Sequence, residues 1–97
     1  MTYYTRRQVV ELLELDELFL VSLEREDIVL HDAPPEEEGE FSERMLERAR
    51  VAQNLVRDLE VNLPGVAVIV RLREEMVGLR RHMEDLLAQL GQKPRAR

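Results

Sequence analysis

The feature that most constrains this chain is a stripe of apolar residues at alternating spacings of three and four. The stripe lies within residues 64–90, and no polar residue interrupts it. This spacing is the a/d pattern of a coiled coil, in which two helices bury one seam against each other. The seven positions predicted to serve in dimerisation are Ile69, Leu72, Met76, Leu79, Met83, Leu86 and Leu90.

The helix predicted over residues 64–90 is too long for a chain of 97 residues to cover. Its length would be roughly 40 Å, about twice what a small domain covers on its own surface. We therefore expect its far half to pair with a second copy of the chain. The flanking charges favour a parallel pair, with Glu75 opposite Arg80, but exposed ion pairs of this kind are weak and leave the orientation open.

The start of this helix allows two interpretations. Residues 66–70 are mostly β-branched and are typical of a buried strand. The heptad pattern that begins at Ile69 favours a helix, buried on all sides at its start and exposed on one side further along. The polar residues 91–97 are predicted to form a disordered tail.

The composition excludes several classes of function. The chain has no cysteine, and its two histidines, His31 and His82, have no companions at ligand spacing. It also has no glycine-rich phosphate loop and no histidine and acid at a spacing useful for catalysis. We therefore expect no catalytic residue, no metal and no cofactor, and a protein that is not an enzyme. With no signal peptide or membrane span in the sequence, and no cysteine, we expect a cytoplasmic protein.

Charge is distributed unevenly along the chain. Residues 1–40 carry three arginines against twelve acids, whereas the remainder carries eleven basic residues against eight acids. The first part is therefore strongly acidic, which disfavours phosphate backbones and favours basic partners.

Two short helices joined by a tight turn are predicted near the start of the chain. The first follows the N-cap Thr5 and runs to about Leu13, and the second runs from the N-cap Asp16 to about Arg25. Their size and spacing are those of a helix-turn-helix unit. The residues predicted to face the core are Val9, Val10, Leu12 and Leu13 in the first helix, and Phe19, Leu20 and Leu23 in the second.

Residues 31–40 form an acidic loop, because they combine two prolines, a glycine and several acids. If Phe41 returns to the core, residues 28–41 form a small hairpin or wing. The alternative is a solvated loop, which better explains the run of Glu36, Glu37 and Glu38.

A third helix is predicted from the N-cap Ser42 to about Glu60. Its core stripe comprises Phe41, Met45, Ala49, Ala52, Val56 and Leu59. The opposite side carries Arg50, Asn54 and Arg57. This is either a cationic face for an anionic partner or a solvated face with the pairs Glu47–Arg50 and Arg57–Glu60, and the second interpretation is the ordinary one.

The residues around the turn before the long helix resemble those of a known family. The pattern D-L-x-V-N-L-x-G-V is similar to that of the CbpM-type chaperone modulators. It stands here as Asp58, Leu59, Val61, Asn62, Leu63, Gly65 and Val66. The N-terminal half resembles the helix-turn-helix opening of MerR-type regulators, with Tyr4, Thr5, Leu12, Leu20, Glu24, Arg25, Glu26 and Ile28 in matching places.

The resemblance implies a mainly α fold: a MerR-like winged helix-turn-helix over residues 1–63, followed by the long C-terminal coiled-coil helix. It also implies a function, because CbpM-type proteins bind the J-domain of a DnaJ- or CbpA-type co-chaperone and regulate its stimulation of a DnaK-type chaperone. J-domains carry a basic helix that suits an acidic surface. The residues expected to bind it are Glu11, Glu14, Glu17, Leu18, Val21, Glu24, Glu26 and Asp27.

The alternative is a dimeric transcriptional regulator of the MerR or heat-shock-repressor kind. MerR-type regulators usually place arginine and aromatic residues along the second helix, where this chain has Asp16, Glu17, Leu18, Val21, Ser22 and Leu23. Acidic residues there would face the DNA phosphates. DNA binding would then have to use other cations, namely Arg44, Arg48, Arg50 and Arg57 or the tail residues Arg95 and Arg97.

Overall fold

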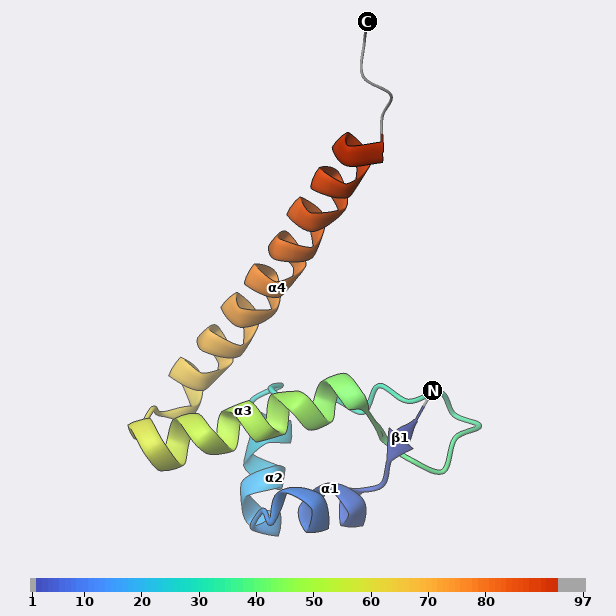
Figure 1. The fold of residues 1–97 in the computed structure, drawn as a ribbon. Helices are drawn as coiled ribbons and strands as arrows, with labels where there is room; N and C mark the ends of the chain where they lie inside the picture. The colour runs from blue at the N-terminus through green and yellow to red at the C-terminus, as the bar shows by residue number, and fades with distance from the viewer. Residues whose placement is uncertain (1, 93–97) are drawn as a thin grey trace, which may run out of the picture.

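The computed structural model describes residues 2–92, and most of them are helical (Figure 1). The elements in chain order are β1 (Tyr3–Tyr4), α1 (Arg6–Leu13), α2 (Glu17–Arg25), β2 (Phe41–Ser42), α3 (Glu43–Leu59) and α4 (Leu63–Gln92). Figure 1 shows α1, α2 and α3 gathered into one body, from which the far half of α4 projects. The predicted mainly α class is confirmed.

The first three helices begin at the predicted capping residues. The Thr5 hydroxyl accepts a hydrogen bond from the Gln8 amide at 3.1 Å, and the Gln8 side chain accepts one from the Thr5 amide at 2.9 Å. Asp16 caps α2 through the Leu18 amide, and Ser42 caps α3 through the Met45 amide. The predicted helix-turn-helix arrangement of α1 and α2 is therefore built by local capping.

The two strands pair the start of the chain with the residues before α3. Tyr4 lies opposite Phe41 in an antiparallel ladder. Phe41 is fully buried, so its return to the core is confirmed. A hairpin within residues 28–41 is wrong, because β2 pairs with β1 and residues 28–30 form no strand. The acidic residues 36–38 stay exposed, as the loop interpretation required.

One hydrophobic core joins all four helices. Its buried members are Val9, Leu15, Leu20, Leu23, Ile28, Val29, Phe41, Met45, Ala49, Ala52, Val66 and Val70. Two residues predicted to face it do not. Leu12 is 59% exposed, because α1 reaches the core through Val9 and its neighbours and turns Leu12 outwards. Leu59 is 68% exposed because it is the last residue of α3, where the chain turns away.

The long helix α4 starts at Leu63, with Pro64 in its first turn, so residues 66–70 are helical and not a strand. The expectation that this start is buried on all sides is wrong. Val66 and Val70 are buried against the body, whereas Val68 and Ile69 on other sides of the helix are exposed. The helix includes residues 91 and 92 of the predicted tail, and residues 93–97 lie outside the described part of the chain.

Candidate functional site

The solvent-facing side of α2 carries acidic and apolar side chains. Val21 lies four residues after Glu17 and three after Leu18, so the three side chains share one side of α2. The buried pair Leu20 and Leu23 lies on the opposite side. Leu18 is 75% exposed and Val21 is 38% exposed, so the two form an apolar pair on the surface. We define the α2 face as Glu17, Leu18, Val21 and Arg25. Arg25 was not among the predicted binding residues, although its spacing of four from Val21 places it on this face.

Two more predicted binding residues extend the α2 face towards α1. Glu11 lies on the exposed side of α1, and Glu14 lies in the turn between the two helices. Glu14 has a left-handed backbone, with a φ of 52°, and forms the C-cap of α1. The turn therefore carries a carboxylate beside the start of α2, where Glu17 also points to solvent.

Glu24 differs from the other predicted binding residues because its carboxylate is already hydrogen-bonded to other residues of this chain. Arg6 donates to both of its oxygens at 2.5 and 2.6 Å, and His31 Nε2 lies 2.5 Å from Oε2. Burial alone would raise the pKa of Glu24, but the hydrogen bonds from Arg6 and His31 outweigh it and lower the pKa. Glu24 therefore joins α1, α2 and the acidic loop.

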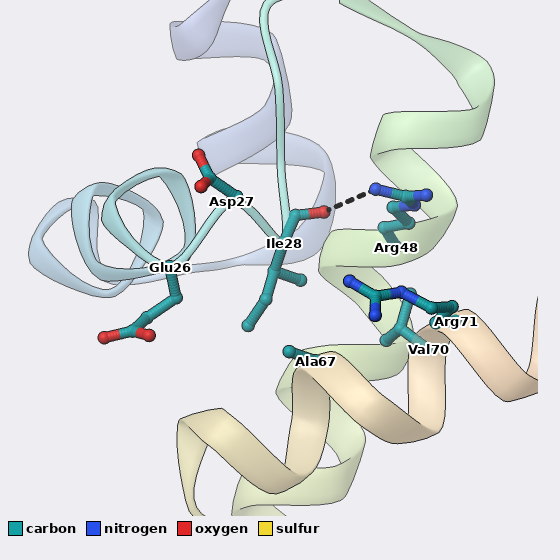
Figure 2. Close-up of a pocket in the computed structure, with 7 residues that line it drawn as sticks. All are labelled: Glu26, Asp27, Ile28, Arg48, Ala67, Val70 and Arg71. Carbon is teal, nitrogen blue, oxygen red and sulfur yellow. Dashed lines mark hydrogen bonds between the residues drawn. The ribbon is translucent and has the colours of Figure 1, made fainter.

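Glu26 and Asp27 lie at the other end of α2, beside a cavity of about 190 Å³ (Figure 2). The cavity lies where the segment after α2 meets α3 and α4, and its lining includes Ala67 and Val70. In Figure 2 the Arg71 guanidinium extends from α4 along this cavity, on the side away from Glu26. The eight predicted binding residues therefore fall into three sets. One is an exposed group on α1, the turn and α2, the second is Glu24, which is hydrogen-bonded within the chain, and the third is the pair Glu26 and Asp27 beside the cavity.

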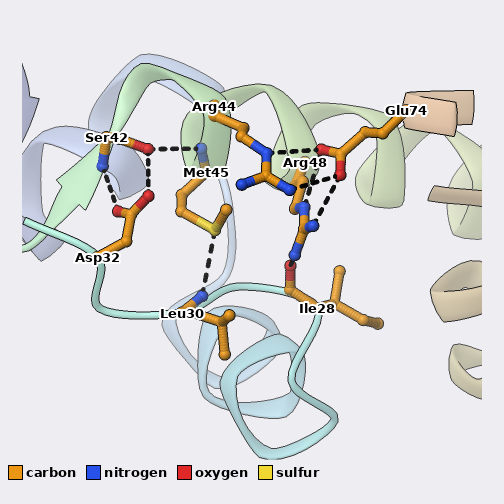
Figure 3. A network of polar contacts seen from close by, with 8 residues as sticks. All are labelled: Ile28, Leu30, Asp32, Ser42, Arg44, Met45, Arg48 and Glu74. Atoms are coloured by element: carbon orange, nitrogen blue, oxygen red, sulfur yellow. Dashed lines mark hydrogen bonds and ion pairs between the residues drawn. The ribbon is translucent and has the colours of Figure 1, made fainter. Parts of the chain in front are cut away.

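An ion-pair cluster joins α3 to α4 (Figure 3). Glu74 of α4 accepts hydrogen bonds from Arg48 at 2.7 and 2.9 Å and from Arg44 at 3.0 Å. The hydrogen bonds from Arg48, followed by those from Arg44, lower the pKa of Glu74 to about 2 against the opposing effect of burial. Arg48 also donates to the Ile28 carbonyl at 3.3 Å, so the cluster reaches the segment that follows α2.

The other cations of α3 are paired as well. Arg50 binds Glu47 at 2.6 Å, which confirms that predicted pair. The predicted pair of Arg57 with Glu60 is wrong: Arg57 binds Asp58 at 3.1 Å, and Glu60 lies beyond the last turn of α3 as its left-handed C-cap. All four arginines of α3 proposed as DNA contacts therefore have acidic partners, and Arg95 and Arg97 lie outside the described residues.

The heptad stripe of α4 faces away from α3. Val70 and Glu74 are residues of α4 that contact the body. Leu72 follows Val70 by two residues, and Met76 follows Glu74 by two. Because two residues turn a helix by about 200°, both stripe residues point away from the body. All seven stripe positions are exposed, from 37% at Ile69 to 69% at Met76. The stripe therefore does not pack on the described part of its own chain. It lines shallow apolar hollows, such as one of about 480 Å³ beside Ile69, Leu72 and Met76.

Residues 2–92 contain no cluster of three or more histidine, aspartate or glutamate side chains that could hold a metal ion. Within the same part of the chain, no helix has the length and hydropathy needed to cross a membrane.

Comparison with known families shows a relationship over most of the chain. The sequence model of a family described as "MerR HTH family regulatory protein" matches residues 4–88. The match covers both the helix-turn-helix and most of α4. No curated protein and no solved structure matches the chain.

Proposed function

The chain belongs to the MerR HTH family of regulatory proteins, and from this premise we propose that it is a non-enzymatic chaperone modulator. It binds the J-domain of a DnaJ- or CbpA-type co-chaperone and regulates the stimulation of the DnaK-type chaperone. The partner comes from the resemblance of residues 58–66 to the CbpM-type modulators. The binding surface is the α2 face together with Glu11 and Glu14.

The observation that carries this proposal is the chemistry of the α2 face. In a helix-turn-helix protein that reads DNA, the second helix enters the major groove and presents cations and hydrogen-bond donors. Here the corresponding helix presents the carboxylate of Glu17 and the apolar side chains of Leu18 and Val21, with a single cation, Arg25, at its last residue. An apolar centre bordered by carboxylates suits a protein surface that carries basic residues around an apolar contact.

The exposed acids have a different role from the apolar pair. Glu11, Glu14 and Glu17 steer a basic helix towards the surface and set its orientation, and their effect depends on ionic strength. Leu18 and Val21 provide the area that is removed from water on binding. Glu24 acts indirectly, because its hydrogen bonds from Arg6 and His31 hold the two helices in place.

The alternative function is DNA binding as a transcriptional regulator of the same family. The family match over residues 4–88 and Arg25 on the α2 face both favour it, since one guanidinium there could reach a phosphate. The arginines of α3 add little, because each is already paired with an acid of this chain. We therefore prefer the protein partner.

We also propose that the stripe of α4 pairs with the stripe of a second copy, which makes the protein a homodimer. A run of seven half-exposed apolar residues over roughly 30 Å of helix is larger than the patches that monomers tolerate. Its heptad spacing matches a partner with the same spacing, which a second copy supplies by definition. Glu75 and Arg80, beside the stripe, have no ion-pair partner within the described residues and are available to the other helix.

The test of the modulator function is a calorimetric titration of the full chain with an isolated J-domain from a DnaJ-type protein. We expect saturable binding that weakens with added salt, and a loss of at least tenfold in affinity for Glu17→Arg. The control is Glu38→Arg, which makes the same charge change in the acidic loop away from the α2 face and keeps the affinity within about twofold.

Two outcomes would contradict the proposal. Equal losses for Glu17→Arg and Glu38→Arg would mean that net charge, and not the α2 face, governs binding. No binding to the J-domain, together with duplex DNA binding that falls steeply with salt, would support the regulator instead.

A further inference from the structure

The α2 face carries charges of both signs, arranged along the helix axis. Glu17 lies in the first turn of α2, and Arg25 is its last residue. The exposed apolar pair Leu18 and Val21 lies between them. At 1.5 Å per residue, the two charged positions are roughly 12 Å apart along the axis. The face therefore has an acidic end, an apolar centre and a basic end.

The acidic end is extended by the turn before α2. Glu14 lies three residues before Glu17, and Glu11 lies on the exposed side of α1. Within residues 2–92, none of these three carboxylates forms an ion pair. All three are therefore available to cations of a partner.

Arg25 is available at the other end of the face. Its guanidinium forms no ion pair within the described part of the chain. The adjacent Glu24 is already hydrogen-bonded to Arg6 and His31, and Glu26 lies beside the cavity of Figure 2. Arg25 can therefore bind an acidic group of a partner.

We infer that the α2 face fixes the direction of the partner helix, with Glu17 and its neighbouring acids on the basic end of that helix and Arg25 on an acidic side chain of the same helix. This inference rests on the proposed function. It adds that the partner surface carries charges of both signs, separated by roughly 12 Å or about eight helical residues. A helix bound in the reverse direction would place like charges opposite each other at both ends.

The test is a calorimetric titration of the full chain with an isolated J-domain. We expect Arg25→Glu to weaken binding about tenfold, although this change makes the α2 face more acidic. Attraction between an acidic face and a basic helix alone would give the opposite sign, because the same change would then strengthen binding. The control is Arg81→Glu, the same charge change at an exposed position of α4, which should keep the affinity within about twofold.

The effect of Arg25 on binding must be separated from its effect on stability. A cation in the last turn also stabilises the end of a helix through the helix dipole. Arg25→Ala adds no carboxylate at this end and should weaken binding severalfold. Thermal unfolding followed by circular dichroism checks that both variants of Arg25 are folded at the temperature of the titration.

The direction of the bound helix can be measured independently. Because the chain has no cysteine, Glu14→Cys and Glu26→Cys each give a single site for a spin label, one near each end of the face. In NMR spectra of an isotope-labelled J-domain, the label at position 14 should broaden signals at the basic end of the bound helix. The label at position 26 should broaden those around its acidic residue.

Three results would overturn the inference. They are Arg25→Glu binding the J-domain as tightly as the natural protein or more tightly, equal broadening of the same J-domain signals by both labels, and duplex DNA binding that Arg25→Glu abolishes. Failure of the proposed function looks different, because then the natural protein binds no J-domain, and the inference falls with it.

Discussion

Glu74 and Arg48 form a bidentate ion pair, at 2.7 and 2.9 Å, that fastens α4 to α3 (Figure 3). The pair is only partly exposed, and Arg48 uses a third donor for the Ile28 carbonyl. Together with the buried Val66 and Val70, it sets the direction in which α4 leaves the body. Both proposed surfaces depend on this junction, because it separates the stripe from the α2 face.

The first prediction concerns the charge of Glu74. We expect Glu74→Gln to lower the free energy of unfolding by about 2 kcal/mol at pH 7, because it weakens charge-assisted hydrogen bonds at a partly buried site. Urea unfolding at one protein concentration measures this loss. Glu84→Gln, at an exposed position of the same helix, should change stability by less than about 0.5 kcal/mol.

The pH dependence follows from the lowered pKa of Glu74, about 2 in the folded protein against the ordinary 4.5. The unfolded chain takes up the proton first as the pH falls, so the contribution of Glu74 is complete above about pH 5 and is lost between 4.5 and 2. The difference in stability between the natural protein and Glu74→Gln should therefore shrink as the pH is lowered from 5 to about 2.5. A difference that stays constant would contradict the assignment.

The second prediction separates the structural role of Glu24 from binding. Glu24→Gln should lower the free energy of unfolding by about 1.5 kcal/mol, because Arg6 and His31 lose a charged acceptor. Thermal unfolding followed by circular dichroism measures this change. Below the unfolding transition, the J-domain affinity of Glu24→Gln should stay within about twofold of the natural protein. A loss as large as that of Glu17→Arg would show that Glu24 contacts the partner directly.

The third prediction compares two glycines. A Cβ at Gly39 would lie 2.6 Å from the Tyr3 carbonyl carbon and the Tyr4 nitrogen, so Gly39→Ala must displace the backbone of β1. We expect it to lower the free energy of unfolding by about 2 kcal/mol. Gly78 lies inside α4 with nothing within 4 Å of the added Cβ, so Gly78→Ala should raise stability by up to about 1 kcal/mol. Urea unfolding of both variants checks the opposite signs.

The fourth prediction uses two glutamates with left-handed backbones, Glu14 and Glu60. Both lie at helix C-caps, where glycine is preferred and a negative charge faces the carboxyl end of the helix. We expect Glu14→Gly and Glu60→Gly each to raise the free energy of unfolding by about 0.5 to 1 kcal/mol.

The same two variants should differ in binding. Glu14→Gly removes a carboxylate beside the α2 face and should weaken J-domain binding severalfold, whereas Glu60→Gly at the far end of α3 should not. Calorimetry with both variants makes this comparison at matched stability. Equal affinities would remove Glu14 from the binding surface.

The helix boundaries were predictable because their causes lie within a few residues. Thr5, Asp16 and Ser42 each bind an amide two or three positions ahead, and such caps can be recognised in the sequence. The exposure of Leu18 and Val21 followed in the same way from the position of the buried Leu20 and Leu23. The burial of residues whose environment depends on distant segments was harder to predict. Leu12 and Leu59, which are exposed, were wrongly assigned to the core.

The long-range ion pairs could not be predicted from neighbouring residues either. The ion pair of Arg48 with Glu74 joins residues 26 positions apart, and that of Arg6 with Glu24 joins residues 18 apart. Nothing in the spacing of these residues distinguishes them from the exposed charges nearby. Their pairing follows from how the helices pack, so the roles of Arg48 and Glu24 were missed.

The sequence was sufficient to establish the caps, the long helix and the apolar stripe along it, because hydrogen bonds between near neighbours and the 3.6-residue turn act over short distances. The sequence did not show that β2 pairs with β1, that Glu24 is hydrogen-bonded to Arg6 and His31, or that the stripe faces away from α3. Those features depend on which buried faces meet in the core. Burying Val66 and Val70 against the body is what orients α4 and leaves the stripe from Ile69 to Leu90 exposed.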